Sequence, residues 1–331
     1  MVQGCEKAAA PAPLGRAPRV SYRAVPAAAA LAEPGMLAVI GFGAGQMAEV
    51  DDARWLALAL EPFDAPAPLE CWTVEGEVVT GRADAIHWSR GGGWLFASIT
   101  LDETAHGGAE PAAERAYQAL TAFVAKQPER HVLRVWNYLA AINEGEDDAE
   151  RYKQFCSGRA CGMGDAFGEG FPAATAIGHL DHRPRLQVYL LAGTQPGVRV
   201  ENPRQVSAWR YPRQYGPTPP SFARAMRLPG DDALAISGTA AVIGHASAHH
   251  DDLQAQLEET LANLEALLAS AGMPAGFDTH SPLKAYVRHP ADARAVRDFF
   301  RQRLPGVPVL LLHGDICRRE LLVEIDGWRY V

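Results

Sequence analysis

The chain of 331 residues is 48% hydrophobic and 21% charged, a balance typical of a globular protein with room for two or three compact units. Its formal net charge of −8 argues against a general surface for nucleic acid or anionic membranes, and no long uninterrupted apolar run predicts a membrane span. Five cysteines at irregular spacing and an N-terminus without a secretory signal pattern predict reduced thiols in a cytoplasmic protein.

The first 74 residues are rich in alanine and proline and show one clear predicted strand, GMLAVIGFG. This segment is either an eroded copy of the units that follow it or an irregular covering domain, and the sequence leaves both interpretations open. GFGAGQ, at residues 41–46, lacks the third glycine of a dinucleotide-binding fingerprint. No nucleotide cofactor is therefore predicted.

Two later stretches repeat one order of elements. The first has a predicted strand at 92–102, a helix at 111–127, a strand at 131–140, a helical stretch at 147–156, and strands at 171–180 and 185–193. The second has a strand at 232–244, a helix at 251–272, a strand at 283–290, a helix at 292–304, and strands at 307–314 and 321–327. The repeat predicts an α+β fold with three domains, at 1–74, 75–200 and 201–331.

Glu324 interrupts the apolar run of the last predicted strand, LLVEIDG. When the two repeats are superposed, Tyr189 occupies the matching position, so the repeated fold does not require an acid there. The pattern alone allows Glu324 to face solvent from an edge strand or to be buried. Burial would disfavour the carboxylate and raise the pKa of the side chain.

The second repeat resembles the RidA/YjgF family of small trimeric proteins, in which a mixed sheet packs on two helices. The resemblance rests on SGTAAV, on the helix QLEETLANLEALLASAGM and on the closing VEIDG. Members that hydrolyse imines use an arginine at a set distance before the glutamate of the closing strand. Val309 stands at that position here, which argues against imine hydrolysis.

A longer resemblance covers most of the chain from about residue 90 onward. The chain is similar to the chorismatase family in RVWNYLAAINEGEDDAERYKQFCSGR, FPAATAIG, WRYPRQYGPTPPSFARA, SGTAAVIGH and GDICRRELLVEIDG, in this order. Chorismatases hydrolyse chorismate to pyruvate and a hydroxybenzoate or a dihydroxycyclohexadiene carboxylate. The resemblance implies RidA-like domains joined in one chain with pseudo-threefold symmetry, and an active site between the central and C-terminal domains. We expect a monomer, although the sequence leaves the oligomeric state open.

The chemistry of this family requires an acid that holds its proton near neutral pH, because cleavage of the enol pyruvyl ether begins with protonation of its methylene carbon. The resemblance implies that Glu324 is this acid and that Cys317 influences the product. Cysteine at this place accompanies 3-hydroxybenzoate, whereas alanine accompanies simple hydrolysis to the dihydrodiol. The ratio of 3-hydroxybenzoate to 4-hydroxybenzoate stays open.

Chorismate carries two carboxylates, which require local basic groups in an acidic protein. From the matched motifs we predict a substrate-binding set of Arg159, Tyr215, Lys153, Arg210, Asn137 and Gly238. Arg213 is a further basic candidate, and Tyr152 and Tyr211 are hydrogen-bonding neighbours. His245, His249 and His250 precede the long helix, where polar residues usually act as caps, and the proposed chemistry needs no metal. We therefore predict neither a metal nor another cofactor.

Two alternatives remain open from the sequence. One is a RidA-like imine or enamine hydrolase, and the other is a non-catalytic RidA-like module that binds aromatic acids. Pyruvate release from chorismate, as opposed to ammonia release from an imino acid, separates the enzymatic readings.

Overall fold

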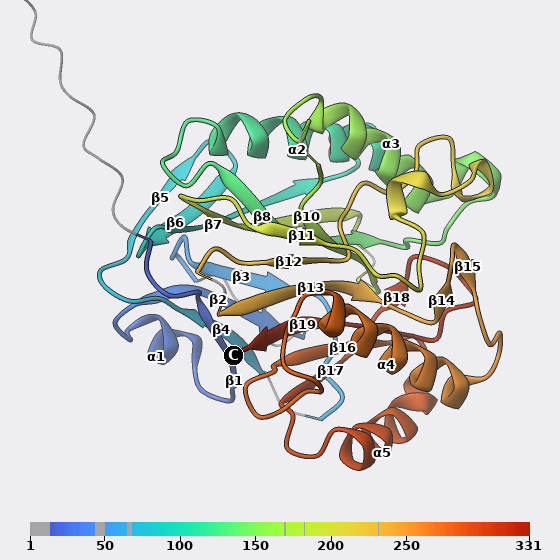
Figure 1. Cartoon of the computed structure of the whole chain (residues 1–331). Helices are drawn as coiled ribbons and strands as arrows, with labels where there is room; N and C mark the ends of the chain where they lie inside the picture. The colour runs from blue at the N-terminus through green and yellow to red at the C-terminus, as the bar shows by residue number, and fades with distance from the viewer. Residues whose placement is uncertain (1–13, 44–49, 65–67, 169, 182, 231) are drawn as a thin grey trace, which may run out of the picture.

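The computed structural model describes residues 14–43, 50–64, 68–168, 170–181, 183–230 and 232–331. The last residues of GFGAGQ and the cysteine at position 5 lie outside the described residues. Three larger sheets surround a common interior, and the long helices lie on the outside of two of them (Figure 1). The α+β class predicted from the repeats is confirmed.

The central sheet has the order β18-β9-β8-β10-β7-β6-β5. Its strands are β5 (Val79–Ala83), β6 (Ile86–Gly91), β7 (Trp94–Asp102), β8 (His131–Ala140), β9 (Ala173–His179), β10 (Arg185–Gly193) and β18 (Asp315–Ile316). The helices α2 (Ala109–Val124) and α3 (Arg151–Met163) cover one face, and the short 3-10 helix η2 (Asp147–Ala149) precedes α3. Small and apolar residues of α2, such as Ala116 and Leu120, are buried against this sheet.

The C-terminal sheet has the order β11-β12-β13-β19-β16-β17. Its strands are β11 (Val198–Val200), β12 (Ala225–Arg227), β13 (Ala233–Thr239), β16 (Leu283–Val287), β17 (Val309–His313) and β19 (Val323–Tyr330). The other elements here are α4 (Leu253–Ser270), α5 (Ala293–Arg303), the 3-10 helices η3 (Ala208–Arg210), η4 (Arg213–Tyr215) and η5 (Pro290–Asp292), and the hairpin of β14 (Val242–Ile243) and β15 (Ala246–Ser247). Asp252 caps α4 by accepting a hydrogen bond from the backbone N–H of Ala255.

The N-terminal sheet has the order β1-β4-β2-β3, with β1 (Arg19–Arg23), β2 (Met36–Phe42), β3 (Trp55–Leu58) and β4 (Leu69–Thr73). One short helix, α1 (Ala27–Leu31), follows β1. Within the described ranges, no long helix corresponding to the pairs on the other two sheets is present here. Residues of β2 and β4 such as Met36, Val39 and Cys71 are nevertheless buried, in a small cluster that includes Leu31 of α1.

The three sheets share one arrangement of four strands. The runs β3-β2-β4-β1, β9-β8-β10-β7 and β17-β16-β19-β13 each contain one parallel pair, next to a strand that is antiparallel to both of its neighbours. The two repeats predicted from the sequence thus have the same topology, and the N-terminal segment has it too. Pseudo-threefold symmetry and the three domain boundaries stay predictions. Membership of the sheets changes between β4 and β5 and between β10 and β11.

The boundaries of two elements differ from the sequence prediction in ways that affect the site. The helical stretch predicted to end at Cys156 continues as α3 to Met163, so that Arg159 lies within a helix. The strand predicted to run to residue 244 ends at Thr239, after a register shift that includes Gly238. The first difference places Arg159 on a helix, and the second places Gly238 one residue before the end of its strand.

The faces of the sheets that point away from the helices meet in an interior that contains aromatic rings and four buried charges. Lys284 on β16 donates a hydrogen bond to the Glu70 carboxylate at 2.8 Å, and Arg134 on β8 lies 3.3 Å from the Asp326 carboxylate. All four side chains are at most 1% exposed. Two cations and two carboxylates compensate each other where water cannot solvate them.

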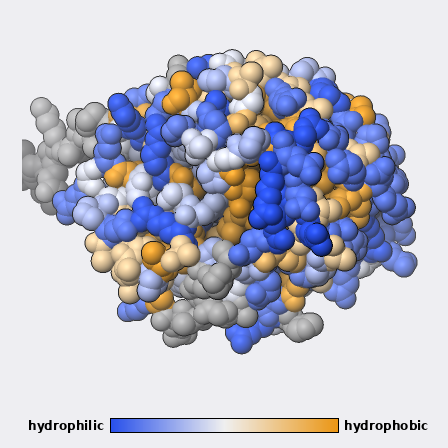
Figure 2. Space-filling view, turned by 90° about the horizontal axis from the view of Figure 1, so that it is seen from below, coloured by the Kyte–Doolittle hydropathy of each residue, from blue (hydrophilic) through white to orange (hydrophobic). Residues whose placement is uncertain are grey.

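The molecular surface is mostly hydrophilic in the view from below (Figure 2), where apolar side chains form small separate areas. This distribution agrees with burial of most large apolar residues in the cores between sheets and helices. Among the described residues, no helix has the length and apolar character needed to cross a bilayer.

Candidate active site

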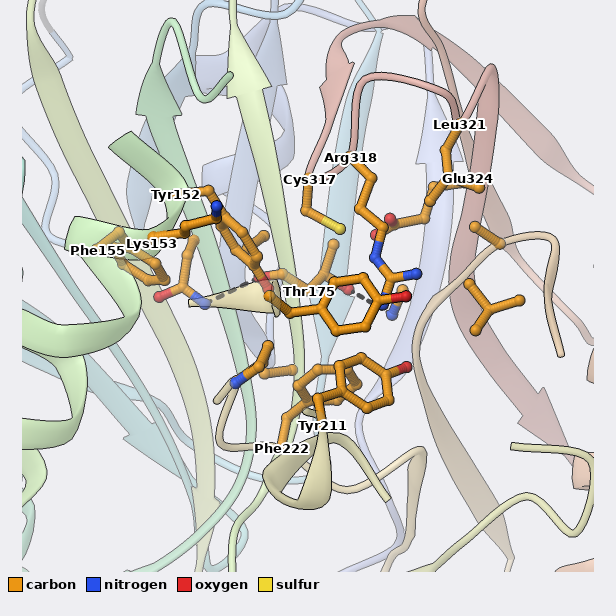
Figure 3. A pocket seen from close by; sticks show the side chains of 18 of the residues that line it. Tyr152, Lys153, Phe155, Thr175, Tyr211, Phe222, Cys317, Arg318, Leu321 and Glu324 are labelled. Atoms are coloured by element: carbon orange, nitrogen blue, oxygen red, sulfur yellow. Dashed lines mark hydrogen bonds between the residues drawn. The ribbon is translucent and has the colours of Figure 1, made fainter. Parts of the chain in front are cut away.

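A pocket with a cavity volume of about 230 Å³ lies where the central and C-terminal sheets meet. The central sheet contributes β8 and β9 to its walls, together with the covering helix α3, and the C-terminal sheet contributes β13 and β19. The segment 205–224 and the loop 317–321 complete the lining. Ser237 joins the sheets beside it, since its Oγ accepts a hydrogen bond from the backbone N–H of Ala174 at 2.9 Å and donates one to the carbonyl of Ala223. In Figure 3, Cys317 and Glu324 lie on the side of the pocket opposite Tyr152 and Lys153.

Glu324 lies on β19, an interior strand of its sheet, with 5% of its surface exposed. Its neighbours Val323 and Ile325 face the core under α4 and α5, so strand alternation turns Glu324 toward the pocket. Burial, together with the nearby Asp326 carboxylate, raises the pKa of Glu324 to about 8, although nearby arginines oppose this shift. The solvent-facing alternative left open by the sequence is therefore wrong.

Gly238 provides the space for the Glu324 carboxyl. A Cβ atom at position 238 would lie 1.9 Å from Glu324 Oε1, well inside van der Waals contact. The Gly238 backbone N–H donates to Thr175 Oγ1 at 2.9 Å, and the Thr175 hydroxyl donates to Asp326 at 2.8 Å. This chain of hydrogen bonds fixes β13, β9 and β19 relative to one another around the acid.

Cys317 follows β18, which pairs with β9 of the central sheet and carries the loop across the junction. Burial, and to a smaller degree the Glu324 charge, raises the pKa of the Cys317 thiol well above its usual value. Burial likewise raises the pKa of the Tyr152 hydroxyl across the pocket. Both groups are therefore neutral near pH 7 and leave Glu324 as the acid with the accessible proton.

Arg159 is 4% exposed and lines the pocket from α3. Its Nε and Nη2 atoms have no hydrogen-bond partner among the described residues, and its guanidinium stacks 5.0 Å from the ring centre of Tyr117. Asn137 lies beside it, accepting a hydrogen bond from Tyr117 and donating one to the Thr175 carbonyl. A buried guanidinium with unused donors is suited to an anionic ligand.

Lys153 and Tyr215 also line the pocket. The Lys153 ammonium lies 3.6 Å from the Glu150 carboxylate. The Tyr215 ring is covered by the guanidinium of Arg318 at 4.0 Å, and its hydroxyl lies 3.3 Å from His245 Nδ1. The structure thus brings together seven of the eight predicted site residues: Glu324, Cys317, Arg159, Tyr215, Lys153, Asn137 and Gly238.

Arg210 is the exception. It lies at the end of η3, is exposed and does not line the pocket, because the 3-10 turn directs it outward while the following Tyr211 lines the cavity. Arg213, another basic candidate from the same motif, is also exposed and forms a bidentate pair with Asp148. The prediction of Arg210 as a pocket residue is therefore wrong.

Three arginines that line the pocket, Arg224, Arg318 and Arg319, were missed from the sequence. Arg319 is exposed, whereas Arg224 and Arg318 are more enclosed. Arg224 is 5% exposed, donates to the Val206 carbonyl and the Tyr211 hydroxyl, and keeps an Nε without a partner in the described chain. Arg318 donates to the His245 carbonyl and Ser247 Oγ. All three lie within matched motifs, SFARA and CRRE, but neither motif indicates which arginine faces inward.

A carboxylic acid that holds its proton near pH 7, beside buried arginines with unused donors, is an arrangement suited to acid catalysis on a small anionic molecule. The comparisons with known proteins agree with this class. Residues 70–192 match the family described as chorismatase FkbO/Hyg5-like, N-terminal.

The chain is 35% identical to a 3-hydroxybenzoate synthase from Streptomyces hygroscopicus, over 83% of this chain and 84% of that protein. It is 36% identical to a chorismatase from Streptomyces rapamycinicus, over 78% and 81% of the two chains. A crystal structure of a chorismatase superposes with a TM-score of 0.84 at 32% identity, covering 94% of this chain and 98% of that one. The chain belongs to the chorismatase family.

Proposed function

We propose that this protein is a chorismatase that cleaves the enol pyruvyl ether of chorismate and forms pyruvate and 3-hydroxybenzoate. The observation that carries the proposal is Glu324, a buried acid with a pKa of about 8 that faces a pocket containing several arginines. The relatives of this protein that are named 3-hydroxybenzoate synthase and chorismatase support the proposed substrate and product.

The reaction begins when Glu324 delivers its proton to the terminal methylene carbon of the enol ether. Near pH 7 a carboxyl with a pKa of about 8 is mostly protonated, whereas an exposed glutamate would be almost fully ionised. Proton transfer creates an oxocarbenium ion on the pyruvyl group and leaves a carboxylate at Glu324. The arginines around the pocket help to stabilise that new negative charge.

The two substrate carboxylates bind to the basic groups on the pocket walls. Arg159 and Arg224 have unused buried donors, and Arg318, held over the Tyr215 ring, supplies a third guanidinium. Lys153 adds an ammonium to the lining of the same pocket. Binding through these groups aligns the methylene carbon with Glu324, because carboxylates and guanidinium groups pair with defined geometry.

Cys317 acts on the ring rather than on the enol ether. Its thiol is neutral and lies on the same side of the pocket as Glu324. Chorismate has the same atoms as pyruvate plus 3-hydroxybenzoate, so this route consumes no water overall, whereas formation of the dihydrodiol consumes one. A neutral thiol near the ring occupies space otherwise open to water and offers a weak donor during aromatisation.

We further propose a cytoplasmic monomer that uses no metal or nucleotide. His249, one of the histidines weighed for a metal, lies 3.3 Å from Glu259 at the start of α4, while His245 contacts Tyr215. Neither contact belongs to the proposed acid chemistry.

The test is incubation of purified protein with chorismate in buffer that contains a chelator and no nucleotide. We expect pyruvate, measured by a coupled reduction assay, and an equal amount of 3-hydroxybenzoate, measured by chromatography. Binding of chorismate without pyruvate release would support the non-catalytic module instead. Ammonia release from an imino acid with no turnover of chorismate would support the imine hydrolase.

A further inference from the structure

One partly buried arginine outside the pocket holds the loop that carries Cys317 and Arg318. Arg288 follows β16, and only 10% of its side chain is exposed. Its Nε donates to the Leu321 carbonyl at 2.8 Å, while Nη2 donates to the carbonyls of Ile316 at 2.9 Å and Arg318 at 2.8 Å. The two residues on either side of Cys317 are thus fixed by one guanidinium.

The remaining donor group of Arg288 connects the loop to the central sheet. Nη1 donates to the Asp315 carboxylate at 2.8 Å and to Asn143 Oδ1 at 3.0 Å. All five N–H bonds of the guanidinium are therefore used, three of them on carbonyls of the loop. The Arg288 backbone N–H donates to the Leu322 carbonyl as well, so the residue binds both ends of the segment 315–322.

We infer that Arg288 is a positioning residue that determines the product through Cys317, an inference that rests on the proposed function. The geometry separates it from the reacting atoms, since Arg288 does not line the pocket. A lysine at this position would keep the positive charge but has a single nitrogen and cannot reach three carbonyls in a fixed plane. Loss of the Arg288 guanidinium allows the loop to move. Water then gains access to the place that the Cys317 thiol occupied.

The experiment compares Arg288→Lys with Cys317→Ala and with the double variant. Arg288→Lys is expected to move the product ratio from 3-hydroxybenzoate toward the dihydrodiol, in the direction of Cys317→Ala. In the Cys317→Ala background the same change is expected to leave the ratio unaltered, because the group through which Arg288 acts is then missing. A shift of equal size in both backgrounds overturns the inference.

A second readout does not depend on turnover. Alkylation of Cys317, followed on its own peptide by mass spectrometry, is expected to be about tenfold faster in Arg288→Lys, because unsatisfied buried carbonyls favour opening of the loop. Unchanged alkylation together with an unchanged product ratio also overturns the inference. If the unmodified protein forms no aromatic product from chorismate, the proposed function fails. The alkylation comparison still tests whether Arg288 holds the loop 315–322 in place.

Arg329→Lys is the matched control. Arg329 is 5% exposed, donates to the carbonyls of Gly276 and Tyr330, and pairs with Asp278 at 3.1 Å, away from the pocket. Arg329→Lys is expected to lower the stability of the fold, because it removes the hydrogen bonds of a buried guanidinium. It is expected to leave the product ratio and the alkylation of Cys317 unchanged. A product shift as large in Arg329→Lys as in Arg288→Lys would show that a general loss of stability, and not the contacts of Arg288 with the loop, decides the product.

Discussion

Equivalent strand positions have different roles in the two repeated sheets, as Tyr189 and Glu324 show. The superposed repeats place Tyr189 opposite Glu324, and the Tyr189 hydroxyl accepts a hydrogen bond from Lys284 in the aromatic interior at 3.2 Å. Glu324 instead faces a pocket, with no hydrogen bond to its carboxyl from the described residues. Burial without a partner is costly for a carboxylate, and this cost keeps the proton in place.

Replacing Glu324 by glutamine removes the proton while nearly preserving size. We expect the rate of pyruvate formation in Glu324→Gln to fall by about 10²–10⁴, the usual contribution of a general acid. Chorismate binding, measured by calorimetry, should persist. Arg210→Ala, at an exposed arginine outside the pocket, serves as control and should retain its kcat and KM. Full turnover by Glu324→Gln would contradict the mechanism.

The raised pKa of Glu324 also predicts how pH affects activity and stability. Activity should fall as pH rises through about 8, because the acid then loses its proton. The folded state holds this proton more tightly than the unfolded state, so stability falls between about pH 4.5 and 8. Relative to the unmodified protein, Glu324→Gln should gain on the order of 3–5 kcal/mol between pH 5 and 9 in chemical denaturation. A constant difference would contradict the assigned pKa.

At the scale of elements, the site depends on an irregularity in β13. The register between β13 and β19 shifts between Ile236 and Thr239, and the shift leaves Gly238 facing the Glu324 carboxyl. A regular strand with a side chain at this place would occupy the space of the acid. The irregularity thus converts two packed strands into a wall of the pocket.

Gly238→Ala tests this arrangement. Because the added methyl would lie 1.9 Å from Glu324 Oε1, the carboxyl must move, and we expect kcat to fall at least tenfold with a stability loss of about 1–3 kcal/mol. Gly168→Ala is the control, since among the described residues its added Cβ would meet one atom within 4 Å, the Asp165 carbonyl oxygen at 3.5 Å. Steady-state kinetics and chemical denaturation measure both effects. An unchanged kcat in Gly238→Ala would show that the acid tolerates displacement.

At the scale of the whole molecule, the buried charges of the interior connect all three sheets. Lys284 of the C-terminal sheet binds Glu70 of the N-terminal sheet, and Arg134 of the central sheet binds Asp326 beside the active site. Burial alone would lower the pKa of Lys284, but Asp326 and Glu70 outweigh it and raise that pKa above the usual value. The interior is held by compensated charge as well as by aromatic packing.

Lys284→Met should therefore destabilise the fold by about 3–5 kcal/mol, because it leaves Glu70 buried without its cation. The double variant Lys284→Met with Glu70→Gln should recover part of this loss, since neither charge is then buried alone. Urea denaturation at one pH gives both values. Equal losses in the single and double variants would show that the pair does not act as a unit.

The sequence was sufficient for the parts of this protein that depend on local pattern. Periodicity and the order of elements predicted the α+β repeats, and the interrupted apolar run identified Glu324. The resemblance to chorismatases, carried by the matched motifs, indicated most of the pocket residues. Local pattern could not decide whether the first 74 residues form a sheet of the same topology, because their helical signal is weak.

The tertiary structure alone decided which side chains of the loops enter the site. Arg210 and Arg224 lie in one matched motif, yet only Arg224 faces the pocket, because packing between segments far apart in the chain sets the direction of a loop. The contacts of Arg288 also depend on the tertiary structure, because its hydrogen-bond partners range from Asn143 to Leu321 in the sequence. The pKa of Glu324 also depends on distant groups, since a buried charge responds to its surroundings in space and not along the sequence.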